Sequence, residues 1–213
     1  MSWSVHVYFH VGVHRSGTGW LSRIGGLLAT AVMGMPFDGY RLHHRNHHRY
    51  NNEEGDVSRT WTPTANGPKA RNPLWYTCAW PLDVARAMAW VRQEVALGAV
   101  EKWIRRRIIA QQILLVILIT LLMSWSYVAG LLYLLYIYLG WAFIALHNYG
   151  QHPPISGAAR SLHSRWYNVV TANNGLHVEH HAQPGANIAT LIPDTAARKT
   201  SLPHPLTALW ERT

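Results

Sequence analysis

The strongest constraint on this chain is a long apolar segment that lacks charged side chains. Between Arg107 and His147 the sequence contains no Lys, Arg, Asp, Glu or His. A helix that crosses a bilayer needs about 20 apolar residues, and this segment offers about twice that number around a polar break at residues 124–126. The alternative, one long buried helix in a soluble protein, is rare at such length and apolarity. We therefore predict a transmembrane helical hairpin over residues 108–146.

Basic residues beside the hairpin predict its orientation. The segment EKWIRRR, residues 101–107, comes directly before it. Lys and Arg next to a spanning segment mark the cytoplasmic side of a membrane. A two-helix hairpin returns the chain to the side from which it started. We therefore expect the parts before and after it to meet on the cytoplasmic face of the cell membrane. The first residues, MSWSVHVYFH, lack the basic region and cleavage site of a secretory signal peptide.

The composition agrees with a membrane protein. Hydrophobic residues make up 49% of the 213 residues and charged residues 14%, against about a quarter charged in soluble domains. The 11 Trp and 10 Tyr suit membrane–water interfaces. The net charge of +9 suits an acidic partner, whereas nucleic-acid binding would leave the hairpin unexplained, so no nucleic-acid partner is expected. Because Cys78 is the single cysteine, an intramolecular disulfide and a cysteine metal cage are excluded.

The rest of the chain is expected to form one all-α domain, residues 1–213, without strands. Residues 20–36 are apolar but short and suit a half-inserted or interfacial helix. Residues 51–73 are polar with Gly and Pro, which predicts a surface loop. Residues 82–107 are expected to form a helix that lies on the membrane, and a shorter helix is expected around residues 161–182.

Histidines occur in three groups with helical spacing. One group is the pair His10 and His14, four residues apart, and the other two are H-x-x-H-H arrays. The arrays contain His44, His47, His48, His177, His180 and His181. Residues at i, i+3 and i+4 share one face of a helix, so each array presents its imidazoles together. Imidazole suits zinc, copper, iron and nickel. Eight such ligands are too many for one tetrahedral ion and suit two ions with open positions.

These motifs resemble those of the membrane fatty acid desaturase superfamily, whose members include acyl desaturases and related hydroxylases. The segments PFDGYRLHHRNHHRYNNEEGD, HNYGQHPP and ANNGLHVEHHAQPGA look particularly like bacterial members. The resemblance covers roughly residues 6–190. It implies a multi-pass membrane protein with a cytoplasmic histidine-rich helical cap. It also implies two iron ions as cofactor, O2 as co-substrate, and oxidation of unactivated C–H bonds in a lipid acyl chain, with desaturation as the expected reaction.

The resemblance also implies a set of metal ligands. By the match of motifs, these are His10, His14, His44, His47, His48, His152, His177, His180 and His181. No catalytic residue is expected beyond them. His152 falls where many members of the superfamily have an additional ligand, although it could also be a loop histidine beside Pro153.

Other residues have open roles at this stage. His43 could replace His44, His147 is expected beside the metal ligands, and His163 could pack near the site or lie on the surface. His6 and His204 are expected to be incidental. A metal-bound imidazole usually donates its other N–H to an acceptor. The candidates for such outer partners are Asp38, Asp56, Asn148, Asn173, Glu179 and Asp194.

The resemblance implies partners and one departure from the superfamily. The substrate is expected to be a lipid or an acyl carrier. The sequence has no haem or flavin motif, so an external electron donor such as a ferredoxin or a cytochrome-type protein is expected. The superfamily normally has a further helical hairpin before its first histidine motif. Here that motif begins at His10, which leaves no room for this hairpin. Either the start of the sequence is truncated or misassigned, or this is a reduced form without the helices that would normally help to wall the acyl channel.

Two alternatives remain open. A hydroxylase that acts on a lipid or a carotenoid would use the same ligands. A histidine-rich metal-binding or metal-transporting membrane protein belongs to a different class. Transporters place ionisable ligands within their spanning segments, and residues 108–146 contain none. A zinc hydrolase is disfavoured because the sequence has no H-E-x-x-H motif.

Overall fold

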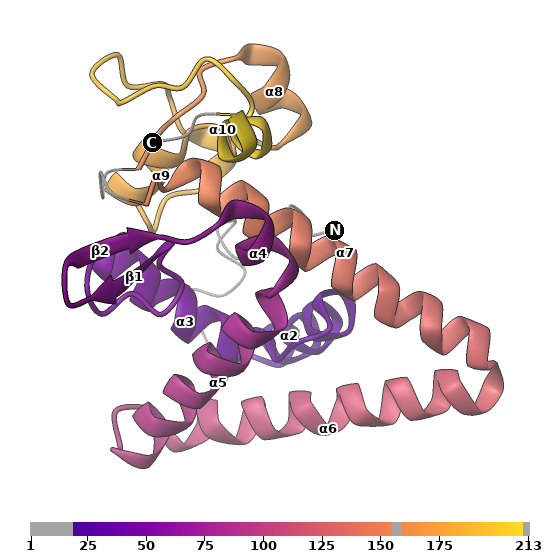
Figure 1. Ribbon diagram of the computed structural model, residues 1–213. Coiled ribbons are helices and arrows are strands. Elements are labelled where there is room, and N and C mark those ends of the chain that lie inside the picture. Colours follow the sequence, from indigo (N-terminus) through magenta and orange to yellow (C-terminus); the bar gives the residue numbers. More distant parts are fainter. Residues whose placement is uncertain (1–18, 155–158, 211–213) are drawn as a thin grey trace.

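The computed structural model describes residues 19–154 and 159–210, which are mostly helical (Figure 1). Two long helices, α6 (Lys102–Trp125) and α7 (Tyr127–Gln151), form the arms of a V that meet at Ser126. Both helices are long and apolar enough to cross a membrane. Only 17% and 11% of their most apolar windows are buried inside the protein, so neither is the core helix of a soluble domain. The helical hairpin and its break at residues 124–126 are confirmed.

The segment before the hairpin differs from the predicted single helix over residues 82–107. Helix α5 (Trp80–Ala96) ends before Gly98, and α6 begins at Lys102. Gly98 has a φ of 75°, a left-handed conformation that glycine adopts without the steric cost of a Cβ. The chain therefore turns at this glycine. The basic residues of segment 101–107 lie in the first turns of α6 itself.

Helix α2 (Trp20–Met33) lies between the two arms of the V (Figure 1). The predicted short helix over residues 20–36 is thus confirmed, and its 14 residues are too few to cross a bilayer. Met33 packs in a buried apolar cluster with Ile137 and Trp141 of α7. The indole N–H of Trp141 donates to the Met33 carbonyl at 2.7 Å. These contacts hold α2 against α7.

A buried carboxylate fixes helix α3 (Phe37–Tyr50) to the base of α6. Asp38 accepts hydrogen bonds from Arg107 Nε at 2.9 Å and from Gln111 Nε2 at 2.7 Å. Its backbone N–H donates to Gln111 Oε1 at 3.0 Å. Asp38 therefore anchors the helix that carries the first H-x-x-H-H array, and none of these bonds goes to an imidazole.

The expectation of a chain without strands is wrong. Strands β1 (Trp61–Thr64) and β2 (Gly67–Ala70) form an antiparallel hairpin inside the segment that we predicted to be a loop. Thr64 pairs with Gly67, which has a φ of 102°. Only Ala65 and Asn66 separate the strands, and of the dipeptide Asn66-Gly67 only the glycine has positive φ. Asn-Gly is a typical signal for a tight hairpin turn, so the sequence carried a signal for this hairpin.

The C-terminal part is built from short helices. They are α8 (Arg165–Val170), α9 (His177–Ala182), the 3-10 helix η1 (Ile188–Thr190) and α10 (His204–Trp210). The predicted helix over residues 161–182 is therefore split in two. Ala172 and Asn173, with φ of 48° and 64°, lie in left-handed conformations that a continuing helix cannot contain. The short helix α4 (Pro73–Cys78) and α10 both pack against α7.

Candidate metal centre

The two H-x-x-H-H arrays lie on helices that face each other. Helix α3 carries His44, His47 and His48, and helix α9 carries His177, His180 and His181. With His152, at the end of α7, these residues form two groups that could each hold a metal ion. The four-histidine group contains His47, His152, His177 and His181. The three-histidine group contains His44, His48 and His180.

Each array contributes to both groups in a complementary way. On α3, the i and i+4 histidines, His44 and His48, join the three-histidine group, and His47 joins the other. On α9, the i and i+4 histidines, His177 and His181, join the four-histidine group, and His180 joins the three-histidine group. Contacts between the rings connect the groups, for example the tilted pair His48 and His181, whose centroids are 4.4 Å apart. The spacing of the arrays therefore produces two adjacent sites.

The ring nitrogens converge within each group. The candidate ligand atoms of a group all lie within 4.8 Å of one another. His152 Nε2 and His177 Nε2 are 2.7 Å apart, and His44 Nε2 and His48 Nε2 are 3.1 Å apart. His47 Nε2 is buried, and among the described residues it has no hydrogen-bond partner. Facing nitrogen lone pairs repel each other unless a proton or a metal ion lies between them. The convergence therefore fits bound cations.

Burial keeps these imidazoles in the form that binds metal. Burial, together with neighbouring imidazoles, lowers the pKa of His152 and His177 well below the ordinary value of 6.5. Both are then neutral near pH 7 and can donate a lone pair, as metal coordination requires. The donor set contains imidazoles alone, which suits a transition metal such as iron and does not suit magnesium or calcium.

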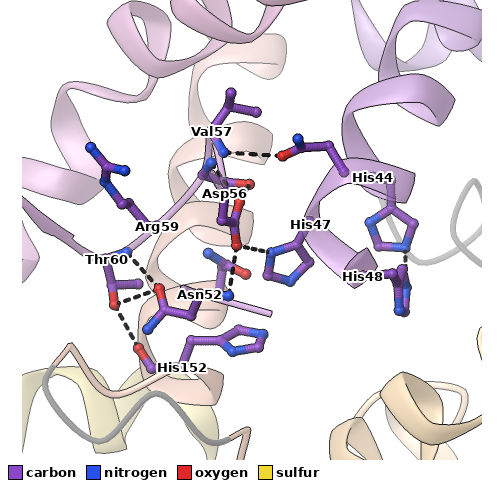
Figure 2. Close-up of polar contacts among 12 residues, drawn as sticks. His44, His47, His48, Asn52, Asp56, Val57, Arg59, Thr60 and His152 are labelled. Carbon is purple, nitrogen blue, oxygen red and sulfur yellow. Dashed lines mark hydrogen bonds and ion pairs between the residues drawn. The ribbon is translucent and has the colours of Figure 1, made fainter. Parts of the chain in front are cut away.

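Asp56 orients the central histidine of α3. Its Oδ2 accepts a hydrogen bond from His47 Nδ1 at 2.7 Å, which turns Nε2 toward the four-histidine group (Figure 2). Asp56 also accepts from the backbone N–H groups of Asn52 and Ser58, each at 2.8 Å. Burial alone would raise the pKa of the Asp56 carboxyl, but His47 and these hydrogen bonds lower it below its usual range. The carboxylate stays ionised and fixes the imidazole tautomer.

The segment that contains Asp56, residues 52–60, also holds the backbone of His152. Thr60 Oγ1 donates to the His152 carbonyl at 2.8 Å, and the Thr60 N–H donates to Asn52 Oδ1 at 2.8 Å (Figure 2). Asn52 has a left-handed φ of 70°, which places its side chain against Thr60 while its N–H meets Asp56. Residues 52–60 therefore connect a ligand candidate on α3 with one at the end of α7. Sequence reasoning identified Asp56 but missed Asn52 and Thr60.

Glu179 stabilises α9 without contacting the array. It accepts hydrogen bonds from Ser161 Oγ at 2.5 Å, from His163 Nε2 at 2.8 Å and from the Asp194 N–H at 2.8 Å. His163 thus packs near the site as a partner of Glu179. The remaining candidates for outer partners contact other groups: Asn148 donates to Tyr76 Oη, and Asn173 donates to the Ile188 and Ala189 carbonyls.

Seven of the nine predicted ligands lie in the two groups, and His10 and His14 lie outside the described residues. His43, the alternative to His44, belongs to neither group. Its Nε2 lies 2.9 Å from Ser58 Oγ, and burial lowers its pKa to about 4.

A separate polar cluster surrounds His147 at the end of α7. His147 Nε2 lies 2.7 Å from Asn174 Nδ2 and 3.0 Å from Tyr167 Oη. The ring of His204 lies edge-on to His147, with centroids 5.1 Å apart. We call these four residues the His147–His204 cluster. His204 is fully buried, so the expectation that it is incidental is wrong. Nothing in its spacing indicated this contact, because the two histidines belong to different helices.

An apolar cavity of about 150 Å³ leads to the histidines. His44, His47 and His177 line it at the histidine groups, and Trp141, Phe143 and Ile144 line it along α7. The cavity therefore connects the two histidine groups with the apolar arm of the hairpin.

Comparison with known protein families gave one match. The fatty acid desaturase family matches residues 1–197, which is nearly the whole chain. Neither the curated proteins nor the solved structures gave a match.

Proposed function

The chain belongs to the fatty acid desaturase family, and from this premise we propose that it uses two histidine-bound iron ions and O2 to desaturate a lipid acyl chain. The proposed ligands are His44, His47, His48, His152, His177, His180 and His181, with His10 and His14 of the segment outside the described residues. Iron bound there would supply the reactivity with O2 that breaks an unactivated C–H bond.

The observation that supports this proposal most is the position of the apolar cavity. It contacts His44, His47 and His177 at one end and continues along Trp141 and Phe143. An acyl chain that enters it would lie against both histidine groups. A metal-storage or metal-transport protein would not need an apolar cavity at its ligands, so this position favours an enzyme that acts on an apolar substrate.

The protein would contribute positioning. Asp56 orients His47, and Thr60 holds the backbone of His152, so two ligands from different helices keep a fixed separation. Aromatic and aliphatic residues of α7, such as Trp141 and Ile144, would hold the acyl chain and exclude water from the reacting carbon. The position of oxidation would then follow from how far the chain extends beyond the histidines.

The proposed topology places both ends of the hairpin on the cytoplasmic side of the cell membrane. Basic residues in the first turns of α6, including Arg105 and Arg106, support this orientation. Electrons would come from an external ferredoxin or cytochrome-type donor. The net charge of +9 suits an acidic surface on such a partner.

Lipid profiling of cells that express the chain tests the proposal. Cells with the wild-type protein should accumulate acyl chains with a new double bond, and cells with His180→Ala should not, at matched membrane expression. Iron analysis of the purified wild-type protein should give two ions per chain. Stoichiometric zinc after iron-replete growth, with unchanged lipids, would contradict the proposal.

Product analysis also separates the alternative reaction. A hydroxylase acting on a lipid or a carotenoid would use the same histidines but would give an alcohol whose oxygen derives from O2. Growth under 18O2 followed by mass spectrometry distinguishes the two, since a desaturated product carries no new oxygen.

A further inference from the structure

A hollow lined by arginines lies against the segment that orients His47. Three arginines from different parts of the chain meet there: Arg59, Arg71 after β2, and Arg86 on α5. Trp61, Thr62 and Asp83 also line it, beside residues 55–57. We call it the arginine hollow. Its volume is about 360 Å³.

The arginine hollow carries excess positive charge. Asp83 pairs with both Arg71 and Arg86 at 2.8 Å, so one carboxylate serves two guanidinium groups. Asp56 also reaches the hollow, but its oxygens accept hydrogen bonds from His47, Asn52 and Ser58. Within residues 19–154 and 159–210, no carboxylate pairs with Arg59.

Arg59 is held in a way that leaves its hydrogen-bond donors available. Its guanidinium lies over the Trp61 ring at 4.8 Å from the centroid. Stacking uses the flat face of the group, whereas its N–H donors lie in the plane. A planar array of donors beside further guanidinium groups matches the oxygens of a phosphate, which accept paired hydrogen bonds from arginine.

The arginine hollow and the apolar cavity share a wall. Asp83 lines both, and Ser58 lines the cavity while its neighbours Val57 and Arg59 line the hollow. An amphiphile with its apolar chain in the cavity would therefore have its polar end close to the arginines. A substrate without a charged end, such as a hydrocarbon or a carotenoid, would leave them unused.

We propose that the arginine hollow binds the phosphate group carried by the polar end of the acyl substrate. The proposal rests on the proposed function for its acyl chain, but phosphate binding itself requires no turnover. The phosphate could belong to a membrane lipid headgroup or to the phosphopantetheine arm of a soluble acyl carrier. Both present the same chemistry to the arginines.

Equilibrium binding to the full-length protein in nanodiscs of neutral lipid tests the site directly. The probes are sn-glycerol 3-phosphate, for the lipid headgroup, and 4′-phosphopantetheine, for the carrier, measured by calorimetry at low salt. The Arg59→Gln/Arg86→Gln variant should bind the preferred probe at least about tenfold more weakly, because charge-assisted hydrogen bonds are lost. Arg71 is left unchanged because it also packs over Tyr76 at 4.5 Å.

Two further variants keep the test specific. Arg92→Gln removes the same charge from an exposed position of α5 outside the arginine hollow and should bind as the wild type does. Asp83→Asn removes the negative charge that competes with phosphate and should tighten binding severalfold. Equal affinity of the wild type and the double arginine variant, or no binding of either probe to the wild type, would overturn the proposal.

The two probes identify the source of the phosphate. Stronger binding of glycerol 3-phosphate indicates a lipid-linked substrate, and stronger binding of phosphopantetheine indicates a carrier-linked one. Activity assays separate this proposal from the proposed function. If the chain produces no oxidised lipid but the arginine variant binds the phosphate probe more weakly than the wild type, the proposed reaction is wrong and the phosphate site is supported. If oxidation occurs and binding ignores the arginines, only the site is wrong.

Discussion

Two buried sets of imidazoles lie near the end of α7, and their nitrogens meet different partners. In the four-histidine and three-histidine groups, the ring nitrogens converge on one another within 4.8 Å. In the His147–His204 cluster, His147 Nε2 faces the amide of Asn174 at 2.7 Å and the hydroxyl of Tyr167 at 3.0 Å, and His147 Nδ1 lies 3.3 Å from the same hydroxyl. An amide and a hydroxyl can satisfy a buried imidazole, whereas other imidazoles cannot do so without a cation or a shared proton.

The difference shows that the partners of a histidine indicate its role better than its burial does. His180 and His204 are both fully buried. His180 belongs to a group of converging ring nitrogens, and His204 packs edge-on against His147 and Tyr167. The first arrangement suits metal binding and the second suits packing of α10 on α7. Each prediction below tests this contrast.

Removing a histidine from a convergent group should have the largest effect. His47→Ala deletes a proposed ligand and leaves Asp56 without its imidazole partner. Loss of a residue that only orients a ligand typically costs about 10- to 100-fold, so loss of the ligand itself should lower activity by more than about 100-fold. His204→Ala should retain its iron, although a buried side chain is lost. Metal analysis and product formation at matched membrane expression measure both. Equal iron content in the two variants would contradict the claim that the convergent groups bind metal and the His147–His204 cluster does not.

Removing the partner of a ligand should have the next largest effect. Asp56→Asn keeps the size of the side chain but cannot fix the His47 tautomer as a carboxylate does, so metal affinity should fall about 10- to 100-fold. Glu54→Gln, at an exposed position of the same segment, is the control and should be neutral. Competition with a chelator measures the affinity. If Asp56→Asn retains wild-type affinity, the Asp56–His47 contact does not support metal binding.

Local spacing made the histidine groups predictable. Intervals of three and four residues place His44, His47 and His48 on one face of a helix, and α3 has that geometry. The apolar run predicted the two-helix hairpin for a similar reason, because both signals are contained within single segments. The Asn66-Gly67 turn of the β-hairpin was also local, and we overlooked it.

Contacts between distant segments were not predictable in this way. Thr60 donates a hydrogen bond to the carbonyl of His152, which lies 92 positions later in the sequence, and no local pattern around either residue predicts this contact. The pairing of His147 with His204, and of Asp38 with Arg107, likewise depends on how helices pack. Spacing therefore predicted which side chains point together, but packing determines what they contact.

The close approach of α10 to α7 depends on a glycine and can be broken without changing a histidine. A Cβ at Gly150 would lie 1.8 Å from the His204 carbonyl oxygen. Gly→Ala inside a helix ordinarily stabilises by about 1 kcal/mol. Here Gly150→Ala should instead destabilise by about 3 kcal/mol, because α10 must move away. Thermal unfolding in detergent measures this, with Gly185→Ala, which meets open space, as the neutral control. Unchanged stability in Gly150→Ala would contradict the packing of α10.

The smallest predicted effect is the pH dependence of stability that His204 should contribute. Burial lowers the pKa of His204 from 6.5 to about 4, so the folded protein resists a proton that the unfolded chain accepts between those values. Its share of the stability is therefore complete above pH 6.5 and is lost as the pH falls toward 4. At pH 5 the loss is about 2 kcal/mol. His204→Gln lacks this titration, while the other buried histidines are common to both proteins. The free energy of unfolding, measured with denaturant at pH 7.5 and pH 5, should fall less in the variant than in the wild type by that amount. An equal fall in both would mean that His204 is protonated in the folded state, which the edge-on contact with His147 does not accommodate.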